Sequence, residues 1–402
     1  MANTLKFGNG EWYGKKDTIL AYNDENSNYK PLPFNFSRAS KATVINKDGL
    51  IEEVGSGQPR IDYKDDSEGA LLLEPSRTNF LTYSEDFSNN SYTKTNVTVT
   101  SGFLAPNGST NATKLVSSAV NGQLLFGGGS GNTNTKSVSV FAKANTSTSK
   151  FKIIEQYYSG HQTLFDLNLG VVEFNNSVGS KIEDYGNGWY KCTHIQSYTS
   201  GQTNATFAFR TNTPESLFIW GAQLEVGSYA TSYIPTQGST VSRSRDLSDT
   251  QNLSHVIGQT EGVIFYDAIL VHKSTSSSED LFELSIDDGS ANNAFFINNY
   301  NNTLTVLLKS GGSTSFSNNS FNPTEGARYK LGFAYKQNDF ALYINGTLIA
   351  DDSSGTVPTM NQITFGNYYD NRVNFQSNVK VNDFKLYNTR LTNSELAALT
   401  QV

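Results

Sequence analysis

The sequence predicts an all-β protein in which two tandem antiparallel β-sandwiches, or jelly rolls, follow a small N-terminal region and precede one short C-terminal helix. Three observations support this fold class. Apolar residues alternate with a period of two from Tyr329 to Ala350, and short runs rich in Val, Ile, Phe, Tyr and Thr recur between clusters of Gly, Asn and Ser. Helix signals are nearly absent until the C-terminal end. Strands at this spacing are typical of sandwiches and barrels.

The stretch from Tyr329 to Ala350 predicts three consecutive antiparallel strands. Alternate residues from Tyr329 to Tyr335 share one face, and the same pattern returns from Phe340 to Ile344. A turn at residues 337–339 separates these two strands. Asn345-Gly346 then predicts a type I′ turn, because both central residues of that turn need positive φ. We expect the side chains of this sheet to serve the core rather than a ligand.

The chain of 402 residues has the length of two or three domains. Residues 1–90 alternate only sporadically, which predicts an extended or small adaptor region. Residues 91–240 hold about eight strand candidates, residues 241–255 are polar and aperiodic as in a linker, and residues 256–402 make the second sandwich. Near the end, Thr392 and Glu395 form a capping box, which predicts one short helix.

Composition excludes several functional classes. The net charge is −7 and no basic run occurs, which argues against a nucleic-acid partner. The single cysteine, Cys192, permits neither an intrachain disulfide nor a Cys-based zinc cluster. No apolar run reaches the length of a signal peptide or a membrane span, which predicts synthesis in a cytoplasm and no membrane insertion.

Three sequence elements lie between Phe36 and Asn89: FSRASKATVINKDGLIEEV, QPRIDY and LLLEPSRTNFLTYSEDFSN. In this order they resemble a segment of tailed-bacteriophage structural proteins, especially fibres and tail or head appendages. The resemblance implies that the N-terminal region attaches the protein to other virion proteins. The charged residues of the segment either form charge-assisted pairs that hold a compact non-sheet fold or pair loosely at the surface. They are Arg38, Arg60, Asp62, Glu74, Arg77, Glu85 and Asp86.

Two further stretches resemble carbohydrate-related domains. GNGWYKC and LFIWGAQLEVGSYATSYIPT resemble the closing strands of a carbohydrate-binding-module-like jelly roll. Their tryptophans, Trp189 and Trp220, stand among apolar neighbours and are expected in the core. The stretch Tyr329–Ala350 stands with MNQITFGNYYD and VKVNDFKLYNTRLTNSELAAL in the last 140 or so residues. Together they are similar to the end of concanavalin A-like, laminin-G-like lectin domains, a fold that serves lectins, glycosidases and structural modules alike.

Catalytic patterns are missing from the sequence. A glucanase of the concanavalin A-like fold would carry Glu-x-Asp-x-x-Glu on one strand, and this pattern does not occur. The nearest carboxylate cluster, Glu279, Asp280 and Glu283, is interpreted as a solvated strand edge. The four histidines lie far apart and no Gly-x-Ser-x-Gly elbow occurs. The sequence therefore predicts no enzyme, no catalytic residue and no cofactor.

No metal site is predicted either. Asp287-Asp288 and Asp351-Asp352 are acidic pairs in turns, where calcium could be held as in some laminin-G-like domains. Acidic pairs in turns are more often solvated, and this is the interpretation adopted.

Glycan binding requires aromatic faces beside amide and carboxylate groups on loops that a rigid sheet supports. Gly366 to Asn374 fits this description, and its candidate residues are Tyr368, Tyr369, Asp370, Asn371 and Arg372. In the alternative, one tyrosine packs in the core and the other caps it. Tyr157 and Tyr158, near Glu155 and His161, form a second candidate.

These observations lead to the hypothesis of a non-enzymatic bacteriophage tail or head fibre or appendage, located at the virion surface. Its lectin-like domains would recognise a host-surface glycan during adsorption. The resemblance to fibres implies a homotrimer, although no coiled-coil heptads occur. The first alternative is a structural capsid or tail decoration protein that contacts only virion proteins. The second is a glycan-degrading hydrolase.

Overall fold

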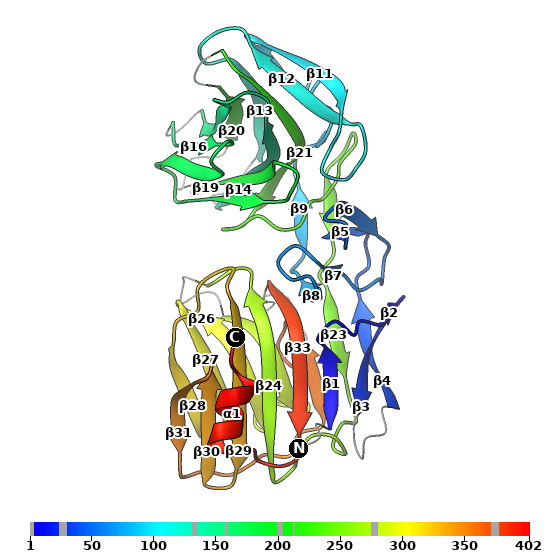
Figure 1. The fold of residues 1–402 in the computed structure, drawn as a ribbon, viewed down its shortest axis with the longest axis vertical. Helices are drawn as coiled ribbons and strands as arrows, with labels where there is room; N and C mark the ends of the chain where they lie inside the picture. Colours follow the sequence, from blue (N-terminus) through cyan, green and yellow to red (C-terminus); the bar gives the residue numbers. More distant parts are fainter. Residues whose placement is uncertain are drawn as a thin grey trace. The chain divides into compact units, whose positions relative to one another are not determined.

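The computed structural model describes residues 4–23, 30–130, 135–156, 160–198, 204–211, 214–274, 280–370 and 378–402. The chain divides into two compact units, each built from more than one segment (Figure 1). Unit 1 comprises residues 1–41, 54–75 and 244–402, and unit 2 comprises residues 42–53 and 76–243. The predicted all-β fold with one short C-terminal helix is confirmed. Within the described residues no helix has the length and apolar character needed to cross a membrane.

Among its described residues, unit 1 contains seventeen strands in one continuous antiparallel arrangement. One row of paired strands runs from β31 through β30, β29 and β24 to β33, and a second runs from β28 through β27, β26, β25, β32, β23 and β4 to β3. β1 joins the two rows because it pairs with both β33 and β3. The bounds are β1 Leu5–Gly8, β2 Gly14–Lys15, β3 Thr18–Asn23, β4 Lys30–Ser37, β7 Ile61–Asp62, β8 Ala70–Leu73, β23 Leu247–Thr250, β24 Glu261–Leu270, β25 Asp280–Asp287, β26 Ala294–Tyr300, β27 Thr303–Ser310, β28 Ser313–Phe321, β29 Arg328–Lys336, β30 Asp339–Ile344, β31 Thr347–Asp352, β32 Gln362–Phe365 and β33 Val379–Tyr387.

The hairpins predicted from Tyr329 to Ala350 are present as β29, β30 and β31. Leu331 and Phe333 of β29 are completely buried in the main core of unit 1. The turn between β30 and β31 has φ of +50° at Asn345 and +79° at Gly346, as a type I′ turn requires. Helix α1, Asn393–Leu399, follows the predicted capping box at Thr392.

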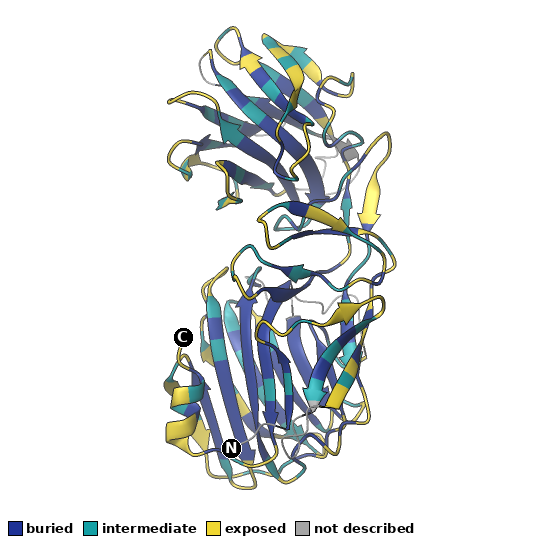
Figure 2. Cartoon of the chain, turned by 45° about the vertical axis from the view of Figure 1, so that its right-hand side comes forward, coloured by how far each residue is buried: buried dark blue, intermediate teal, exposed yellow. Residues whose placement is uncertain are grey.

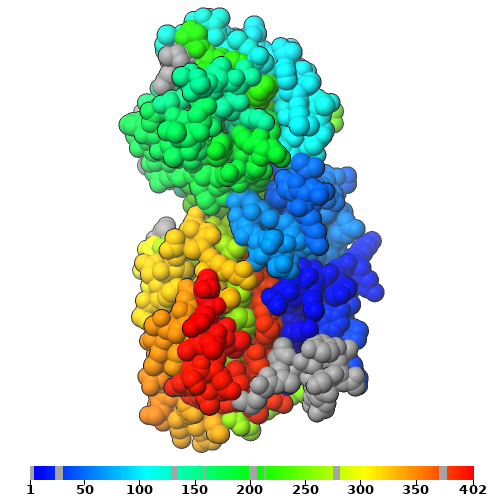
Figure 3. Space-filling model, in the orientation of Figure 1, coloured from blue at the N-terminus to red at the C-terminus, as the bar shows by residue number. Residues whose placement is uncertain are grey.

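The N-terminal strands are part of the unit 1 sandwich, which corrects the prediction of a separate region over residues 1–90. β1 pairs with β33 in the register Phe7 to Phe384, and Phe7 stacks on Phe365 at 5.0 Å between ring centroids. The two ends of the chain thus lie side by side within this unit, dark blue beside red in Figure 3. Strands β1, β3 and β4 are short, so apolar and polar residues alternate too few times to mark them as strands. No local pattern can reveal that β1 pairs with β33 at the other end of the chain.

The predicted linker at residues 241–255 also contains strands. β22, Val241–Arg243, pairs with β9 in unit 2, and β23 pairs with β4 and β32 in unit 1. Both strands are short and rich in polar residues, so their sequence resembled a linker. The boundary between the two units falls at residues 243 and 244.

Unit 2 is the jelly-roll-like sandwich predicted for the middle of the chain. Its two six-stranded antiparallel sheets have the orders β10-β13-β20-β15-β16-β17 and β11-β12-β21-β14-β19-β18. Their inner faces are buried (Figure 2), and both Trp189 and Trp220 lie in the core as expected. The bounds are β5 Ala42–Ile45, β6 Ile51–Val54, β9 Arg77–Asn79, β10 Thr93–Thr95, β11 Val97–Phe103, β12 Ala112–Ser117, β13 Gln123–Ser130, β14 Lys136–Ala144, β15 Lys150–Glu155, β16 Gln162–Asp166, β17 Val171–Asn175, β18 Gly179–Asp184, β19 Trp189–Gln196, β20 Asn204–Arg210 and β21 Ser216–Val226.

Several charged residues of the phage-like segment form a buried network in unit 1. Arg60 lies 2.7 Å from Glu74, and both Arg60 and Arg38 bind the carboxylate of Asp246. The predicted charge-assisted pairing therefore occurs in part, although Asp246 was expected in the linker. Arg77 instead places its guanidinium 4.7 Å from the ring centroid of Tyr229.

Asn79 ties the phage-like segment to the core of unit 2. Its Nδ2 donates to the carbonyls of Ala222 and Ile234, and its Oδ1 accepts from the backbone N–H groups of Leu81 and Leu224, at 2.9–3.2 Å. The side chain is completely buried. It therefore satisfies four backbone groups that water cannot reach.

We expect Asn79→Ala to destabilise unit 2 by about 2–3 kcal/mol, because it leaves buried backbone groups without partners. Chemical denaturation of the full chain measures the loss. Thr78→Ala is the matched control, since the Thr78 hydroxyl bonds to that of the exposed Ser242 at 2.7 Å. Similar losses in the two variants would contradict this role of Asn79.

Candidate functional site

The predicted glycan loop begins with two tyrosines that pack against unit 1. The ring of Tyr368 lies 4.5 Å from that of Phe282 and 5.2 Å from that of Phe296, and Tyr369 lies 4.5 Å from Tyr368. Both tyrosines are half-buried, and Asp370 is exposed. These contacts match the packed alternative.

The other predicted residues of both glycan sites, Asn371, Arg372, Tyr157 and Tyr158, lie outside the described residues. Glycan binding by the loop at Tyr368 and by the Tyr157–Tyr158 segment therefore stays a prediction.

Near the second predicted site, Glu155 and His161 belong to a polar cluster inside unit 2. Glu155 and His194 are completely buried, and Nδ1 of His161 lies 2.9 Å from the side-chain oxygen of Gln196. Burial, and to a lesser extent the neighbouring His161, lowers the pKa of His194 to about 3. Glu155 and His194 face the interior and offer no exposed platform for a sugar, whereas His161 is half-buried.

Glu283 does not lie on a solvated strand edge, contrary to the interpretation of its sequence. The side chain is completely buried and accepts a hydrogen bond from the hydroxyl of Tyr329. Burial raises the pKa of Glu283 to about 8, although the bond from Tyr329 acts in the opposite direction. The other two carboxylates of the predicted cluster, Glu279 and Asp280, have no described side chains.

Of the two acidic pairs considered for calcium, Asp351–Asp352 ends strand β31, and Asp287–Asp288 uses its carboxylates internally. Asp287 accepts from Gly289 and Gln362, and Asp288 accepts from Ser290 and Asn293. The described part of the chain contains no group of three or more His, Cys, Asp or Glu side chains placed to hold a metal ion.

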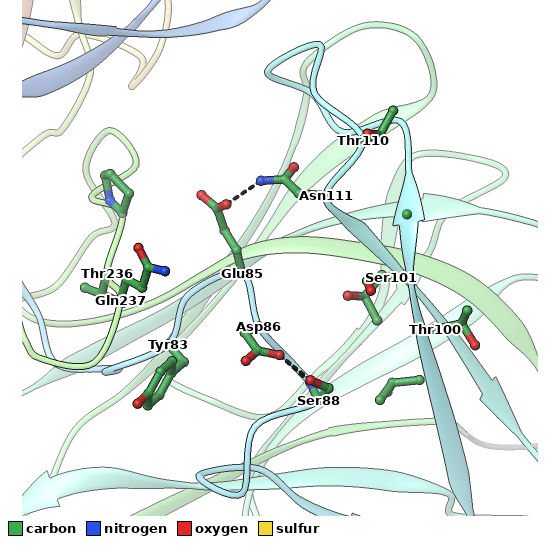
Figure 4. Close-up of a pocket in the computed structure, with 14 residues that line it drawn as sticks. Tyr83, Glu85, Asp86, Ser88, Thr100, Ser101, Thr110, Asn111, Thr236 and Gln237 are labelled. Carbon is green, nitrogen blue, oxygen red and sulfur yellow. Dashed lines mark hydrogen bonds between the residues drawn. The ribbon is translucent and has the colours of Figure 1, made fainter.

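A cleft of about 930 Å³ lies within unit 2 (Figure 4). Its walls come from residues 83–88, from β11, from residues 110–113 at the start of β12, and from residues 235–237. The lining residues are Tyr83, Glu85, Asp86, Ser88, Val99, Thr100, Ser101, Gly102, Thr110, Asn111, Thr113, Pro235, Thr236 and Gln237. Most of them carry hydroxyl, amide or carboxylate groups.

Glu85 and Asn111 form a fixed pair on one wall of the cleft. Oε1 of Glu85 accepts from the Tyr233 hydroxyl at 2.8 Å, and Oε2 accepts from Nδ2 of Asn111. Oδ1 of Asn111 in turn accepts from Nε1 of Trp220 at 3.0 Å and from the Ser109 hydroxyl at 2.6 Å. Burial raises the pKa of Glu85, and the bond from Tyr233 opposes this shift. The pair is thus held in one geometry before any ligand arrives.

The local sequence around Glu85 explains its position. Phe87 is completely buried and packs on Tyr92 at 5.1 Å between ring centroids. Ser84 is also buried, and its hydroxyl bonds to that of Tyr233 at 2.7 Å and accepts from the Thr236 N–H at 2.8 Å. These inward anchors on either side leave Glu85 and Asp86 facing the cleft.

The floor and the opposite wall are more open to solvent. Asp86 is exposed, and its Oδ1 accepts from both the N–H and the hydroxyl of Ser88. Thr100 and Ser101 on β11 are exposed and line the cleft, and the Ser101 side chain lies on the side of the strand that faces Glu85 (Figure 4). The cleft can therefore form hydrogen bonds with a polar ligand from two sides.

Sequence reasoning did not identify this cleft. The Tyr83–Phe87 and Ser232–Thr236 stretches carry family resemblances, which assign no ligand site to them. Glu85 and Asp86 were predicted as partners of arginines. Glu85 and Tyr233 are 148 positions apart, so no local pattern connects them. The concentration of polar residues in Asn107–Asn111 was the one signal available.

No protein-family model matches the chain, and no curated protein matches it significantly. Among solved structures, the chain is similar to the CBM40 domain of a Ruminococcus gnavus IT-sialidase bound to α2,3-sialyllactose, with 17% identity over 38% of this chain and 91% of that domain and a TM-score of 0.31. It is also similar to a SAP-like pentraxin from Limulus polyphemus, with 13% identity over 38% and 73% and a TM-score of 0.30. A third match is the binding domain of botulinum neurotoxin serotype G, with 11% identity over 38% and 39% and a TM-score of 0.32. At these values the matches establish neither a family nor a ligand for this chain.

Proposed function

We propose that the protein binds a glycan without transforming it, and that the ligand occupies the cleft of unit 2. The observation that carries this proposal is the preformed polar wall of Glu85 and Asn111 within a cleft of about 930 Å³. Sugar hydroxyls both donate and accept hydrogen bonds, so they require a wall that offers acceptors beside donors. Glu85 and Asp86 supply acceptors, Asn111 supplies its remaining N–H donor, and the Ser101 hydroxyl on β11 supplies both kinds.

The dimensions of the cleft agree with an oligosaccharide ligand. Pockets for small organic ligands typically measure about 300–1,000 Å³ and combine apolar surface with a few oriented polar groups. Tyr83 and Val99, both half-buried, supply apolar surface beside the carboxylates. Because the polar wall is already ordered, ligand binding would cost little additional conformational entropy.

We further propose that the chain is a bacteriophage virion fibre or appendage that presents this cleft to a host-surface glycan. This part rests on the resemblance of Phe36 to Asn89 to phage structural proteins. Residues of that segment, including Arg38, Arg60 and Asn79, make internal bonds, so their pattern reflects a shared scaffold. Attachment to other virion proteins, assembly as a homotrimer and location at the virion surface belong to the same proposal.

Binding of the purified protein to host cells and to a glycan array tests the proposed site. We expect Ser101→Trp to weaken binding at least tenfold, because the indole would fill the cleft without breaking the Glu85–Asn111 pair. Thr98→Trp is the matched control: Thr98 is exposed on the same strand but does not line the cleft. If Ser101→Trp and Thr98→Trp bind the glycan equally well, the binding site does not lie in this cleft.

The same assays separate the alternative functions. Binding that is lost in Tyr369→Ala but kept in Ser101→Trp would assign the glycan to the loop of unit 1. If no host glycan or host cell is bound, the protein is a decoration protein that contacts virion components. Release of soluble saccharide from host polysaccharide would instead identify a hydrolase.

A further inference from the structure

The charge of the cleft indicates which class of glycan it accepts. Glu85 and Asp86 are the charged side chains among the described residues that line the cleft, and both are acidic. Asp86 is exposed, so its carboxyl group lies at the surface of the cleft. Two carboxyl groups of the same sign on adjacent residues thus create a region that disfavours anions.

The two lysines near the cleft are not placed to donate a hydrogen bond to an anion inside it. Lys94 donates to the carbonyls of Ser88, Asn89 and Tyr92 at 2.9, 2.9 and 3.0 Å, which occupies all three of its N–H donors. Lys114 stands opposite Thr100 in the register of β11 and β12, but it is not among the residues that line the cleft. An anionic sugar would therefore enter without a cationic partner.

An unpaired anion in a partly enclosed site loses hydration that it cannot recover. A carboxylate-bearing or sulfated sugar would meet Glu85 and Asp86 in place of the arginine that usually binds such groups in a bidentate manner. A neutral sugar instead presents hydroxyl donors to these same carboxylate oxygens. One oxygen of Asp86, Oδ2, receives no donor from the described residues and is available for this purpose.

We propose that the cleft selects uncharged, hydroxyl-rich saccharides and rejects those that carry sialic acid, uronic acid or sulfate. This inference rests on the proposed glycan binding in unit 2 and specifies its ligand class. The determinants are Glu85 and Asp86, with Asp86 contributing the exposed charge.

The test compares neutral oligosaccharides on an array with their sialylated and sulfated counterparts, using the full chain. We expect each charged member to bind at least tenfold more weakly than its neutral partner at low salt. Asp86→Asn should reduce the ratio of neutral-saccharide affinity to charged-saccharide affinity severalfold. Added salt should reduce this ratio too, because ions screen exposed charges. Thr98→Trp, which leaves the cleft unchanged, should keep the ratio of the unmodified protein.

Equal or tighter binding of the charged members would overturn the inference while leaving glycan binding itself intact. If that preference then disappears in Lys114→Gln, Lys114 is the group that binds the anion. Absence of binding to every saccharide would overturn the proposed function and this inference together. A neutral preference that survives Asp86→Asn unchanged would refute the role given to Asp86.

Discussion

Replacing Asp246 by Asn is expected to destabilise unit 1 by roughly 3–5 kcal/mol. The carboxylate is completely buried between two arginines. Oδ1 lies 3.0 Å from Nη1 of Arg38, and Oδ2 binds Arg60 and accepts from the N–H of Glu74 at 3.0 Å. Two cations and two anions balance one another in this network. Asn keeps the shape but leaves one buried positive charge without a counter-ion.

The protonation behaviour of Arg60 shows how strongly this network holds its charge. Burial opposes the charged form, but the attraction of Asp246 and Glu74 outweighs it and raises the pKa of Arg60. Asp246 is the larger of these two attractions, so its removal withdraws most of the interaction that offsets the burial of the Arg60 charge. The structure must then admit water or shift the backbone around Arg38 and Arg60.

Calorimetry of the full chain measures the effect on the transition of unit 1. Asp249→Asn is the matched control, since Asp249 lies three residues further along the chain on β23, is only half-buried and bonds to Asn35 at 3.0 Å. We expect the control to lose less than about 1 kcal/mol. Equal losses in the two variants would mean that the Asp246 network behaves like exposed ion pairs.

The stability of unit 1 is expected to fall as pH rises from 4.5 to 8, and Glu283→Gln should remove this part of the dependence. In the unfolded chain Glu283 ionises near its ordinary pKa of 4.5, whereas burial raises the folded pKa to about 8. A raised folded pKa favours the folded state below pH 4.5, and the advantage is lost as pH rises through the folded pKa. The total change approaches roughly 5 kcal/mol at pH 8.

Thermal unfolding of wild type and Glu283→Gln at pH 5, 6.5 and 8 tests this expectation. The amide cannot ionise and can still accept the hydrogen bond from Tyr329, so the two proteins should be similar at pH 5. At pH 8 the variant should be the more stable. Glu68→Gln, an exposed carboxylate of the same unit, should follow wild type at every pH. If the unfolding temperatures of wild type and Glu283→Gln change with pH in the same way, the Glu283 carboxyl group is not buried in its protonated form.

Long alternating strands were predictable from the sequence, and short ones were not. β29, β30 and β31 show several periods of alternation and are joined by turns with characteristic residues, so local chemistry determines them. β1 and β23 have four residues each and acquire their place from partners such as β33 and β32. For this reason the two sandwiches were recognised while their boundaries were misplaced.

The candidate cleft was less predictable still. Glu85, Asn111 and Tyr233 come from three separate segments, and they meet because Ser84 and Phe87 anchor one segment inside unit 2. Tyr368 and Tyr369 were predicted to bind a sugar, because adjacent aromatic residues in a polar loop can form a sugar-binding surface. Their contacts with Phe282 and Phe296 depend on tertiary packing, which no local pattern reveals.

Hydrogen–deuterium exchange of the full chain, with and without the oligosaccharide that binds most tightly on the array, tests the central claim most directly. Ligand in the cleft predicts slower exchange at residues 83–88, 97–103, 110–113 and 235–237, with little change in unit 1. Slower exchange confined to residues 280–300 and 366–370, with none around Glu85, would contradict the assignment of the glycan site to unit 2.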